Sequence, residues 1–164
     1  PLDYFKLTPG EGGVRSPMII LGPGIKGEHQ TDAFTYITDI MPTMLEMAGL
    51  EHPQKYQGRE VAPMRGHSIT GLLSGDTKSV YDAEESVGAE MAGGKWLRQG
   101  DFKAVFVPPP FGAGEWLLFD LSNDPGETND LAEINPQKLA ALKAAWDQYA
   151  QDVGVVEISG PISR

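Results

Sequence analysis

The sequence predicts a mixed α/β (α+β) fold, in which one apolar strand and a short helix precede a small antiparallel sheet and a long C-terminal helix. Three observations lead to this class. They are the isolated apolar run at residues 17–21, the strand-like stretches between residues 86 and 121, and the helical periodicity that follows residue 135. Because the strand-like stretches and the final helix are adjacent in the sequence, we expect the helix to cover the sheet.

Residues 17–21, Pro-Met-Ile-Ile-Leu, form a short apolar run between proline and glycine residues. Such a run is typical of a strand buried on both faces, as in a parallel sheet. No run of matching character follows, so we expect its neighbouring strands to lie outside this sequence. The start at Pro1, without a methionine, agrees with a fragment or processed piece of a longer protein. An unpaired strand also predicts self-association of such a fragment.

A short amphipathic helix is predicted over residues 38–49. Thr38 or Asp39 can cap its start, and Pro42 suits its first turn. Gly49 can end it, because glycine readily adopts the left-handed conformation that follows many helices.

The next residues, 50–82, are rich in glycine, proline, glutamine and serine and predict a long connecting segment. Within it, only residues 68–75 suggest a brief helical turn. We therefore divide the chain at this segment, into residues 1–83 and residues 84–164.

The second part contains stretches that alternate apolar and polar residues or are rich in aromatic residues, as strands do. Gly100-Asp101 provides tight turn chemistry between two of them and predicts a hairpin. The predicted strands are residues 86–91, 95–98, 102–107 and 115–121.

The final helix has clear start and stop signals. Asn135 can cap it and Pro136 occupies the first helical position, while Gly154 can end it. Its apolar residues recur at spacings of three and four and predict one buried face: Leu139, Leu142, Trp146, Tyr149 and Val153.

The composition limits the possible partners. The chain has 164 residues, 40% of them hydrophobic, and a formal net charge of −10. Nucleic acid and anionic membrane surfaces are therefore not expected partners, whereas a small anion can still bind at a local cationic site. The absence of cysteine excludes disulfides, cysteine-ligated metals and a cysteine nucleophile within the sequence. It leaves the compartment open, and both the cytoplasm and the periplasm of a bacterium are compatible.

Residues 22–27, Gly-Pro-Gly-Ile-Lys-Gly, match the dinucleotide fingerprint G-x-G-x-x-G. That fingerprint must open a helix, but no helical periodicity follows, and Pro23 lacks a backbone donor. A turn that ends a strand explains the motif better.

The acidic residues 120–133 could suggest a calcium loop. Pro125 and Leu131 occupy the positions where an EF-hand requires glycine and glutamate, which argues against one. We instead expect a turn at Pro125-Gly126, capped by Asp124.

The histidines His29, His52 and His67 are too widely spaced for a recognisable metal site. No serine lies in a nucleophile-elbow motif with histidine and aspartate partners. We expect the histidines to be solvated loop residues and identify no metal ligand in the sequence.

Lys6, Gly12-Gly13 and Arg15 precede the apolar run directly. Glycines and an arginine are ordinary in a surface loop, where the arginine extends its charge into water. The alternative is that the lysine and the glycine-rich backbone face a bound anion.

The order of several motifs resembles the C-terminal third of type I sulfatases, which have an alkaline-phosphatase-like core, and is similar to bacterial arylsulfatases. The segments that carry the resemblance are K…EGGVRSPMIILGPG, ITDIMPTMLEMAG, GRE…RGHSITGLLSG, LRQGDFKAVFV and WLLFDLSNDPGETNDLA. The resemblance implies that residues 18–21 are a late strand of the large core sheet, and that the residues from about 86 onward form a C-terminal subdomain.

The resemblance also implies a role for Lys6. In the family, a lysine before the Gly-Gly-x-Arg stretch reaches the substrate sulfate, and Lys6 stands at this place, six residues before Gly12. It is the one catalytic and substrate-binding residue that we expect here. Arg15 matches a position with a structural role in supporting the loop.

The family's other catalytic parts are expected upstream. The formylglycine nucleophile arises in a C-x-P-x-R or S-x-P-x-R motif, which this sequence lacks, and residues 159–164 (Ser-Gly-Pro-Ile-Ser-Arg) miss it by one position. The divalent metal, expected to be calcium, would have its ligands outside this sequence as well. The resemblance thus implies hydrolysis of sulfate esters by the whole protein and inactivity of the isolated chain.

Two alternatives stay open at this point. A phosphonate or phosphate monoester hydrolase can use the same scaffold. The chain could instead serve as an interaction module without chemistry, because residues 86–154, with their predicted sheet and helix, look self-contained.

Overall fold

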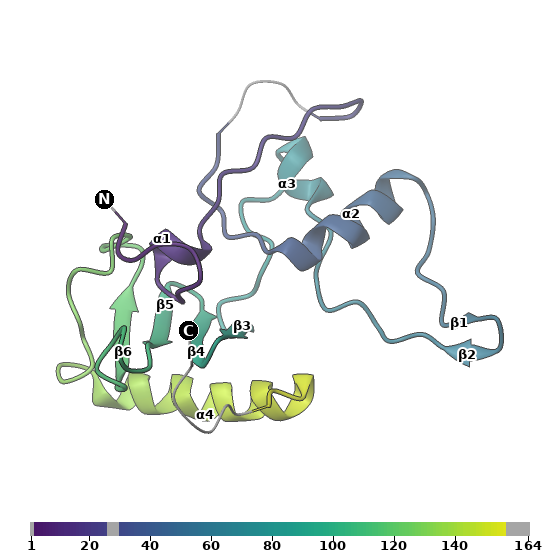
Figure 1. Cartoon of the computed structure of the whole chain (residues 1–164). Helices are drawn as coiled ribbons and strands as arrows, with labels where there is room; N and C mark the ends of the chain where they lie inside the picture. Colours follow the sequence, from purple (N-terminus) through teal and green to yellow (C-terminus); the bar gives the residue numbers. More distant parts are fainter. Residues whose placement is uncertain (1, 26–29, 157–164) are drawn as a thin grey trace. The chain divides into compact units, whose positions relative to one another are not determined.

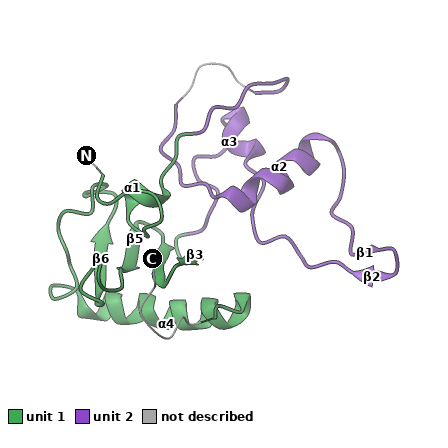
Figure 2. Ribbon diagram, in the orientation of Figure 1, with its two compact units in different colours: residues 1–17, 83–164 green, residues 18–82 purple. Residues whose placement is uncertain are grey.

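The computed structural model describes residues 2–25 and 30–156 of the chain (Figure 1). These residues form two compact units, each described here by itself (Figure 2). Unit 1 comprises residues 1–17 and 83–164, and unit 2 comprises residues 18–82. The mixed fold class predicted from the sequence is confirmed.

The sheet of unit 1 is a four-stranded antiparallel meander, in which each strand pairs with the next along the chain. All of the strands predicted for this part are present, and their bounds agree within a residue: β3 (Ser86–Met91), β4 (Gly94–Gln99), β5 (Phe102–Phe106) and β6 (Trp116–Asp120). The predicted two-residue turn connects β4 to β5, and Gly100 adopts a positive φ of 59° there.

Helix α4 (Pro136–Val153) covers one face of this sheet (Figure 1). The Asn135 side chain accepts a hydrogen bond from the backbone N–H of Lys138 at 3.2 Å, and Gly154 is left-handed, so both predicted end signals are confirmed. The core between helix and sheet consists of Leu97, Ala104, Leu118, Leu142 and Trp146.

The opposite face of the sheet is also buried, which the sequence did not predict. Trp96, Val105 and Phe119 on this face are nearly inaccessible to solvent. Within unit 1, the N-terminal segment with α1 (Glu11–Val14) contacts this face through Glu11, which bonds to Lys103 of β5. The sheet therefore lies between a long helix and an irregular segment.

Unit 2 contains short elements joined by loops. They are the 3₁₀ turn η1 (Ile37–Asp39), helix α2 (Ile40–Met47), the two-residue strands β1 (Lys55–Tyr56) and β2 (Arg59–Glu60), and helix α3 (Thr70–Ser74). Helices α2 and α3 confirm the helices expected at residues 38–49 and 68–75. The β1–β2 hairpin lies in the segment expected to be only a connection.

The strand predicted at residues 17–21 is not formed. These residues have no strand partner among the described residues, and Ile19 and Leu21 are 87% and 89% exposed. A strand needs a neighbour to satisfy its backbone N–H and C=O groups. The described residues supply none, so the segment stays irregular here, and the origin of its neighbouring strands remains a prediction.

Several motifs from the sequence fall partly or wholly outside the described residues. They are the end of the Gly22–Gly27 motif, His29 and residues 159–164. Among the described residues, none of the helices combines the length and apolar character that a membrane crossing requires.

Candidate functional site

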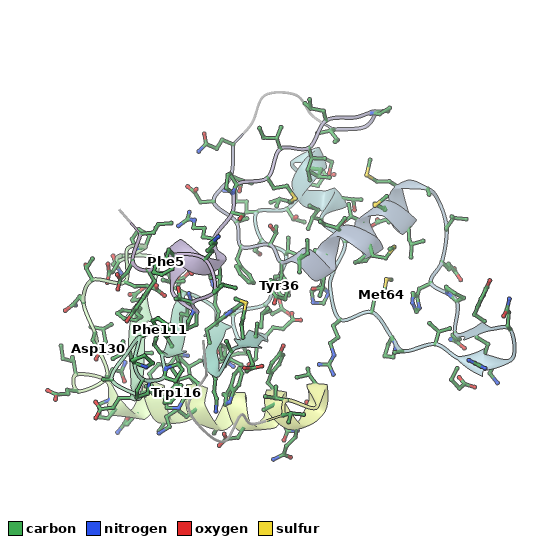
Figure 3. The ribbon with its side chains drawn as sticks, viewed as in Figure 1. Phe5, Tyr36, Met64, Phe111, Trp116 and Asp130 are labelled. Atoms are coloured by element: carbon green, nitrogen blue, oxygen red, sulfur yellow. The ribbon has the colours of Figure 1, made fainter. Side chains whose placement is uncertain are left out.

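Lys6 lies at the surface of unit 1, in the loop that precedes α1. Its neighbours Phe5 (Figure 3) and Leu7 are 63% and 66% exposed. The Thr8 hydroxyl donates a hydrogen bond to the carbonyl oxygen of Phe5 at 2.5 Å and so closes a short turn around Lys6. The lysine is therefore presented outward by a loop with its own internal hydrogen bond.

The backbone of this loop is in an unfavourable conformation on both sides of Lys6. Tyr4 and Leu7 have positive φ angles of 63° and 73°. This left-handed region costs a non-glycine residue roughly 1–2 kcal/mol. The backbone N–H of Gly12 donates to the carbonyl oxygen of Asp3 at 2.8 Å and helps to hold the loop in this form.

Gly12 and Gly13 are required by close backbone packing. A Cβ atom on Gly12 would overlap the carbonyl oxygens of Asp3 and Tyr4, and one on Gly13 would overlap that of Thr8. The double glycine therefore lets the loop fold back onto α1. This contact explains the glycines without any ligand, whereas the sequence suggested that they allow close approach to an anion.

A buried ionic cluster anchors α1 to the sheet. Lys103 Nζ of β5 lies 2.7 Å from Glu11 Oε1 and 2.9 Å from Glu127 Oε1, and it is hydrogen-bonded to Glu11. The backbone N–H of Glu11 donates to Glu127 Oε2 at 2.5 Å. The Lys103 and Glu127 side chains are each only 1% exposed, and that of Glu11 is 10% exposed. We refer to Glu11, Lys103 and Glu127 as the Lys103 cluster.

Burial dominates the electrostatics of this cluster. Desolvation raises the pKa of Glu127, because a carboxylate loses its hydration in the interior, and the charge of Lys103 opposes this rise. Lys103 Nζ also lies 5.6 Å from the centre of the Trp96 ring. Two carboxylates and one ammonium group thus share a site that is closed to water.

The Lys103 cluster was not identified from the sequence. Lys103 lies in the middle of a strand between apolar neighbours, and Glu11 and Glu127 each stand next to a glycine in a tight turn. A lysine in a strand whose two faces are both covered needs a buried counterion, since an unpaired buried charge is costly. The need for counterions around Lys103 can be recognised only when it is known that the N-terminal segment covers the face of the sheet opposite α4.

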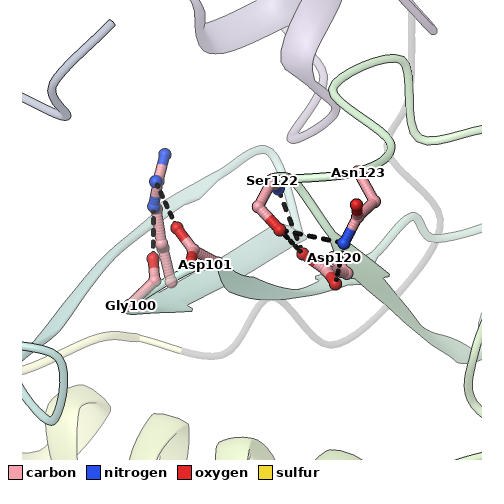
Figure 4. Close-up of polar contacts among 6 residues, drawn as sticks. Gly100, Asp101, Asp120, Ser122 and Asn123 are labelled. Atoms are coloured by element: carbon pink, nitrogen blue, oxygen red, sulfur yellow. Dashed lines mark hydrogen bonds and ion pairs between the residues drawn. The ribbon is translucent and has the colours of Figure 1, made fainter.

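A second set of polar contacts lies at the turn between β4 and β5 (Figure 4). The Arg98 Nε group donates to the carbonyl oxygen of Gly100 at 2.8 Å, and its guanidinium lies 4.0 Å from Asp101 Oδ1. Partial burial lowers the pKa of Arg98, while Glu11 and Asp101 oppose that effect. These contacts stabilise the turn.

The acidic residues 120–133 form a hydrogen-bonded turn. Asp120 accepts hydrogen bonds from the Ser122 hydroxyl at 2.6 Å and from the Asn123 side chain at 2.9 Å (Figure 4), and these bonds lower the pKa of Asp120. Asp124 accepts from backbone N–H groups of the residues that follow Pro125-Gly126, as expected for the predicted turn. The turn brings Glu127 to the Lys103 cluster.

Asp39 of unit 2 is buried, and its role is structural. Its carboxylate accepts hydrogen bonds from the backbone N–H groups of Tyr36 and His67 at 2.7 and 3.0 Å, and from the Tyr81 hydroxyl at 2.5 Å. The His67 ring packs edge-on against Tyr81, and His67 is exposed in a loop, as expected from the sequence. In residues 2–25 and 30–156, no three histidine, aspartate or glutamate side chains are grouped closely enough to hold a metal ion.

The sheet, the helix and the lysine-bearing loop together correspond to the C-terminal part of sulfatases. The family described as "N-sulphoglucosamine sulphohydrolase, C-terminal" matches residues 6–151, a range that begins at Lys6 and includes the whole Lys103 cluster. The chain therefore belongs to this sulfatase family.

Similar proteins agree with this membership. An uncharacterized sulfatase of Schizosaccharomyces pombe is 40% identical over 149 residues, which cover 89% of this chain and 26% of that protein. A choline-sulfatase of Rhizobium meliloti is 32% identical over 170 residues, which cover 94% of this chain and 30% of that protein. Arylsulfatase K of Xenopus laevis is 27% identical over 85% of this chain. The chain thus spans less than a third of the length of each of the first two relatives.

Solved structures show the same fold at lower identity. A 2-O GAG sulfatase is 21% identical, with a TM-score of 0.56 over 85% of this chain and 31% of its own. A protein solved with its substrate D-glucosamine-2-N,6-O-disulfate is also 21% identical, with a TM-score of 0.50 over 69% of this chain and 23% of its own.

Proposed function

We propose that this chain is the C-terminal part of an enzyme that hydrolyses sulfate esters to an alcohol or phenol and sulfate, and that Lys6 contacts the sulfate group. The supporting observation is the outward position of Lys6 on a loop that is held back against unit 1. The family match, which begins at this residue, agrees with the proposal.

A lysine in this position is suited to an anionic substrate. Its ammonium group has three N–H donors and one positive charge. When the bond between sulfur and the ester oxygen breaks, negative charge grows on the leaving oxygen. A cation already held nearby stabilises that charge without reorganising, so it lowers the barrier more than it strengthens substrate binding.

Other parts of the reaction belong to residues outside this sequence. The family implies a divalent metal, which we propose is calcium, and a formylglycine, which supplies the nucleophile. The described residues offer neither a metal-binding group nor a motif for that nucleophile, so we derive no step through either. We accordingly propose that the isolated chain is inactive.

The whole protein that contains this chain provides the test. Replacing Lys6 with alanine should lower kcat/KM for an aryl sulfate by roughly 10²- to 10³-fold, as expected for loss of one preorganised donor. Lys55→Ala is the matched control, because Lys55 is an exposed lysine in a surface ion pair with Glu60 at 2.9 Å. It should leave kcat/KM unchanged within about twofold.

Two results would contradict the proposal. If Lys6→Ala keeps the parental kcat/KM while the protein turns over aryl sulfate, Lys6 does not contact the sulfate. If the wild-type protein prefers an aryl phosphate or phosphonate to the matched aryl sulfate, the alternative hydrolase assignment is correct. Comparing kcat/KM for an aryl sulfate, choline sulfate and glucosamine sulfates then identifies the ester that the protein hydrolyses best.

A further inference from the structure

The Lys103 cluster connects three segments that are distant in the sequence. Glu11 begins α1 directly after the loop that carries Lys6, Lys103 lies in the interior of β5, and Glu127 follows the turn at the end of β6. The Lys103 ammonium bonds to Glu11 Oε1 at 2.7 Å across 92 residues of sequence. One buried cation therefore fixes the N-terminal segment to the sheet.

The charges of the cluster depend on one another. A buried ammonium or carboxylate that loses its partner retains a large desolvation cost. Moving Glu11 away from Lys103 therefore costs free energy, and this cost holds the start of α1 in place on the sheet. Glu127 strengthens this constraint because its Oε2 accepts the backbone N–H of Glu11 at 2.5 Å, which fixes the main chain as well as the side chain.

The constraint extends from Glu11 to Lys6 through the backbone. Gly12 follows Glu11 directly, and its N–H holds the carbonyl group of Asp3 at 2.8 Å. The loop between Asp3 and Gly12 contains the two left-handed residues, Tyr4 and Leu7, that flank Lys6. Such conformations persist only where the surrounding contacts enforce them.

We propose that Glu11 and Lys103 are positioning residues for Lys6, and that the Lys103 cluster sets the place of the Lys6 ammonium group in the active site. The inference rests on the proposed function of Lys6. It predicts that removing the anchor lowers turnover through Lys6, although the three cluster residues are buried away from the surface on which Lys6 lies.

A double-mutant cycle in the whole protein tests this proposal. The variants are Lys6→Ala, Glu11→Ala and the double variant, with kcat and KM for an aryl sulfate measured well below the melting temperature. Glu11→Ala removes the anchor but leaves Lys103 paired with Glu127. It should lower kcat at least tenfold in the wild type and at most twofold in the Lys6→Ala background, because the group being positioned is then absent.

Glu60→Ala is the matched control, since it removes a glutamate from an exposed ion pair. It should change kcat by less than twofold in both backgrounds. If the Glu11→Ala and Lys6→Ala losses multiply in the double variant, Glu11 acts only on stability and the positioning role is wrong. An unchanged kcat in Glu11→Ala would overturn it as well.

Two further measurements separate this proposal from the proposed function. Hydrogen exchange at the Gly12 and Gly13 amides should become at least tenfold faster in Glu11→Ala, and unchanged exchange would refute the anchor whatever the activity. If exchange speeds up but Lys6→Ala is fully active, the function of Lys6 fails and the anchor stands. Should Glu11→Ala not fold, Glu11→Gln takes its place, because it keeps the shape of the side chain but removes the negative charge that pairs with the Lys103 ammonium group. Its loss of kcat should be smaller than that expected for Glu11→Ala and should again disappear in the Lys6→Ala background.

Discussion

Unit 1 buries the apolar side chains between its sheet and its long helix, whereas unit 2 leaves most of those on η1 and α2 exposed. In unit 1, Leu97, Leu118 and Leu142 have no solvent exposure. In unit 2, Ile37, Met41 and Met44 on η1 and α2 are 69%, 56% and 61% exposed. Both units contain large apolar residues, so the presence of such residues alone does not explain this difference.

The comparison shows that the buried apolar cluster between the sheet and α4 gives unit 1 a core of its own. Each buried leucine contributes about 1.5–3 kcal/mol to folding, and unit 1 gathers several of them between its sheet and α4. In unit 2, Ile69 and Leu72 are buried, but the exposed apolar residues on η1 and α2 gain little of this energy from the described residues. Unit 1 is therefore expected to be the stable unit, and the exposed residues of unit 2 are expected to be buried by other parts of a whole sulfatase.

The largest effect is expected in the core of unit 1. Leu142→Ala should lower the free energy of unfolding of the chain by about 2–5 kcal/mol, because it leaves a cavity at a fully buried position. Urea unfolding followed by tryptophan fluorescence measures this change. The signal reports on unit 1 alone, since Trp96, Trp116 and Trp146 all lie there.

Met44→Ala in unit 2 serves as the comparison for Leu142→Ala. Met44 is exposed, so its loss should change the free energy of unfolding by less than about 0.5 kcal/mol when the loss of helix is followed by circular dichroism, a signal to which both units contribute. Equal effects of the two substitutions would show that the contrast between the units is wrong.

A smaller, pH-dependent effect is expected from Glu127. Its pKa is raised on folding by burial, so the stability it contributes is complete below the unfolded pKa of about 4.3 and is lost as pH rises through the folded pKa. Glu127→Gln cannot ionise. The stability of the wild type relative to this variant should therefore fall as pH increases from 4 to 7, as measured by urea unfolding at each pH.

The charged groups around Glu127 also affect how its contribution to stability changes with pH. Lys103 and Glu11 lie against it, and its charge also acts on Tyr4. Glu133→Gln removes an exposed carboxylate from the same acidic segment and is the matched control. A wild-type advantage that grows with pH would mean that Lys103 outweighs the burial of Glu127.

The smallest effect in the isolated chain is expected at residues 17–21. Ile19→Asn should change its stability by less than about 0.5 kcal/mol, because Ile19 is 87% exposed. In the whole protein, the same substitution should lower the melting temperature by several degrees, since there we expect a buried strand. Sedimentation of the isolated chain adds a check, because the self-association predicted for this segment should weaken in Ile19→Asn.

Much of the fold follows from local signals. The turn residues Gly100-Asp101, the Asn135 cap and the terminal Gly154 correctly predicted where elements of unit 1 begin and end. These predictions succeed because helix capping and tight turns are determined by residues that lie within a few positions of one another in the sequence. The position of Lys6 before a glycine-rich turn was likewise visible in the sequence, and its role at the sulfate remains a proposal.

Contacts between distant residues could not be predicted in this way. The strand expected at residues 17–21 has the right composition but no partner among the described residues, and pairing requires a neighbouring strand. The requirement for the double glycine could not be predicted either. It arises because the backbone of Asp3, Tyr4 and Thr8 leaves no room for a Cβ atom at Gly12 or Gly13.

The sequence by itself determined the antiparallel sheet, its covering helix and the candidate lysine. Only the tertiary structure decided that Lys103 is buried, because that depends on the N-terminal segment covering the second face of the sheet. Glu11 and Glu127 are 116 residues apart, and neither has a local reason to be buried. They meet because a lysine enclosed on both sides requires counterions, and that physical requirement appears only when the chain has folded.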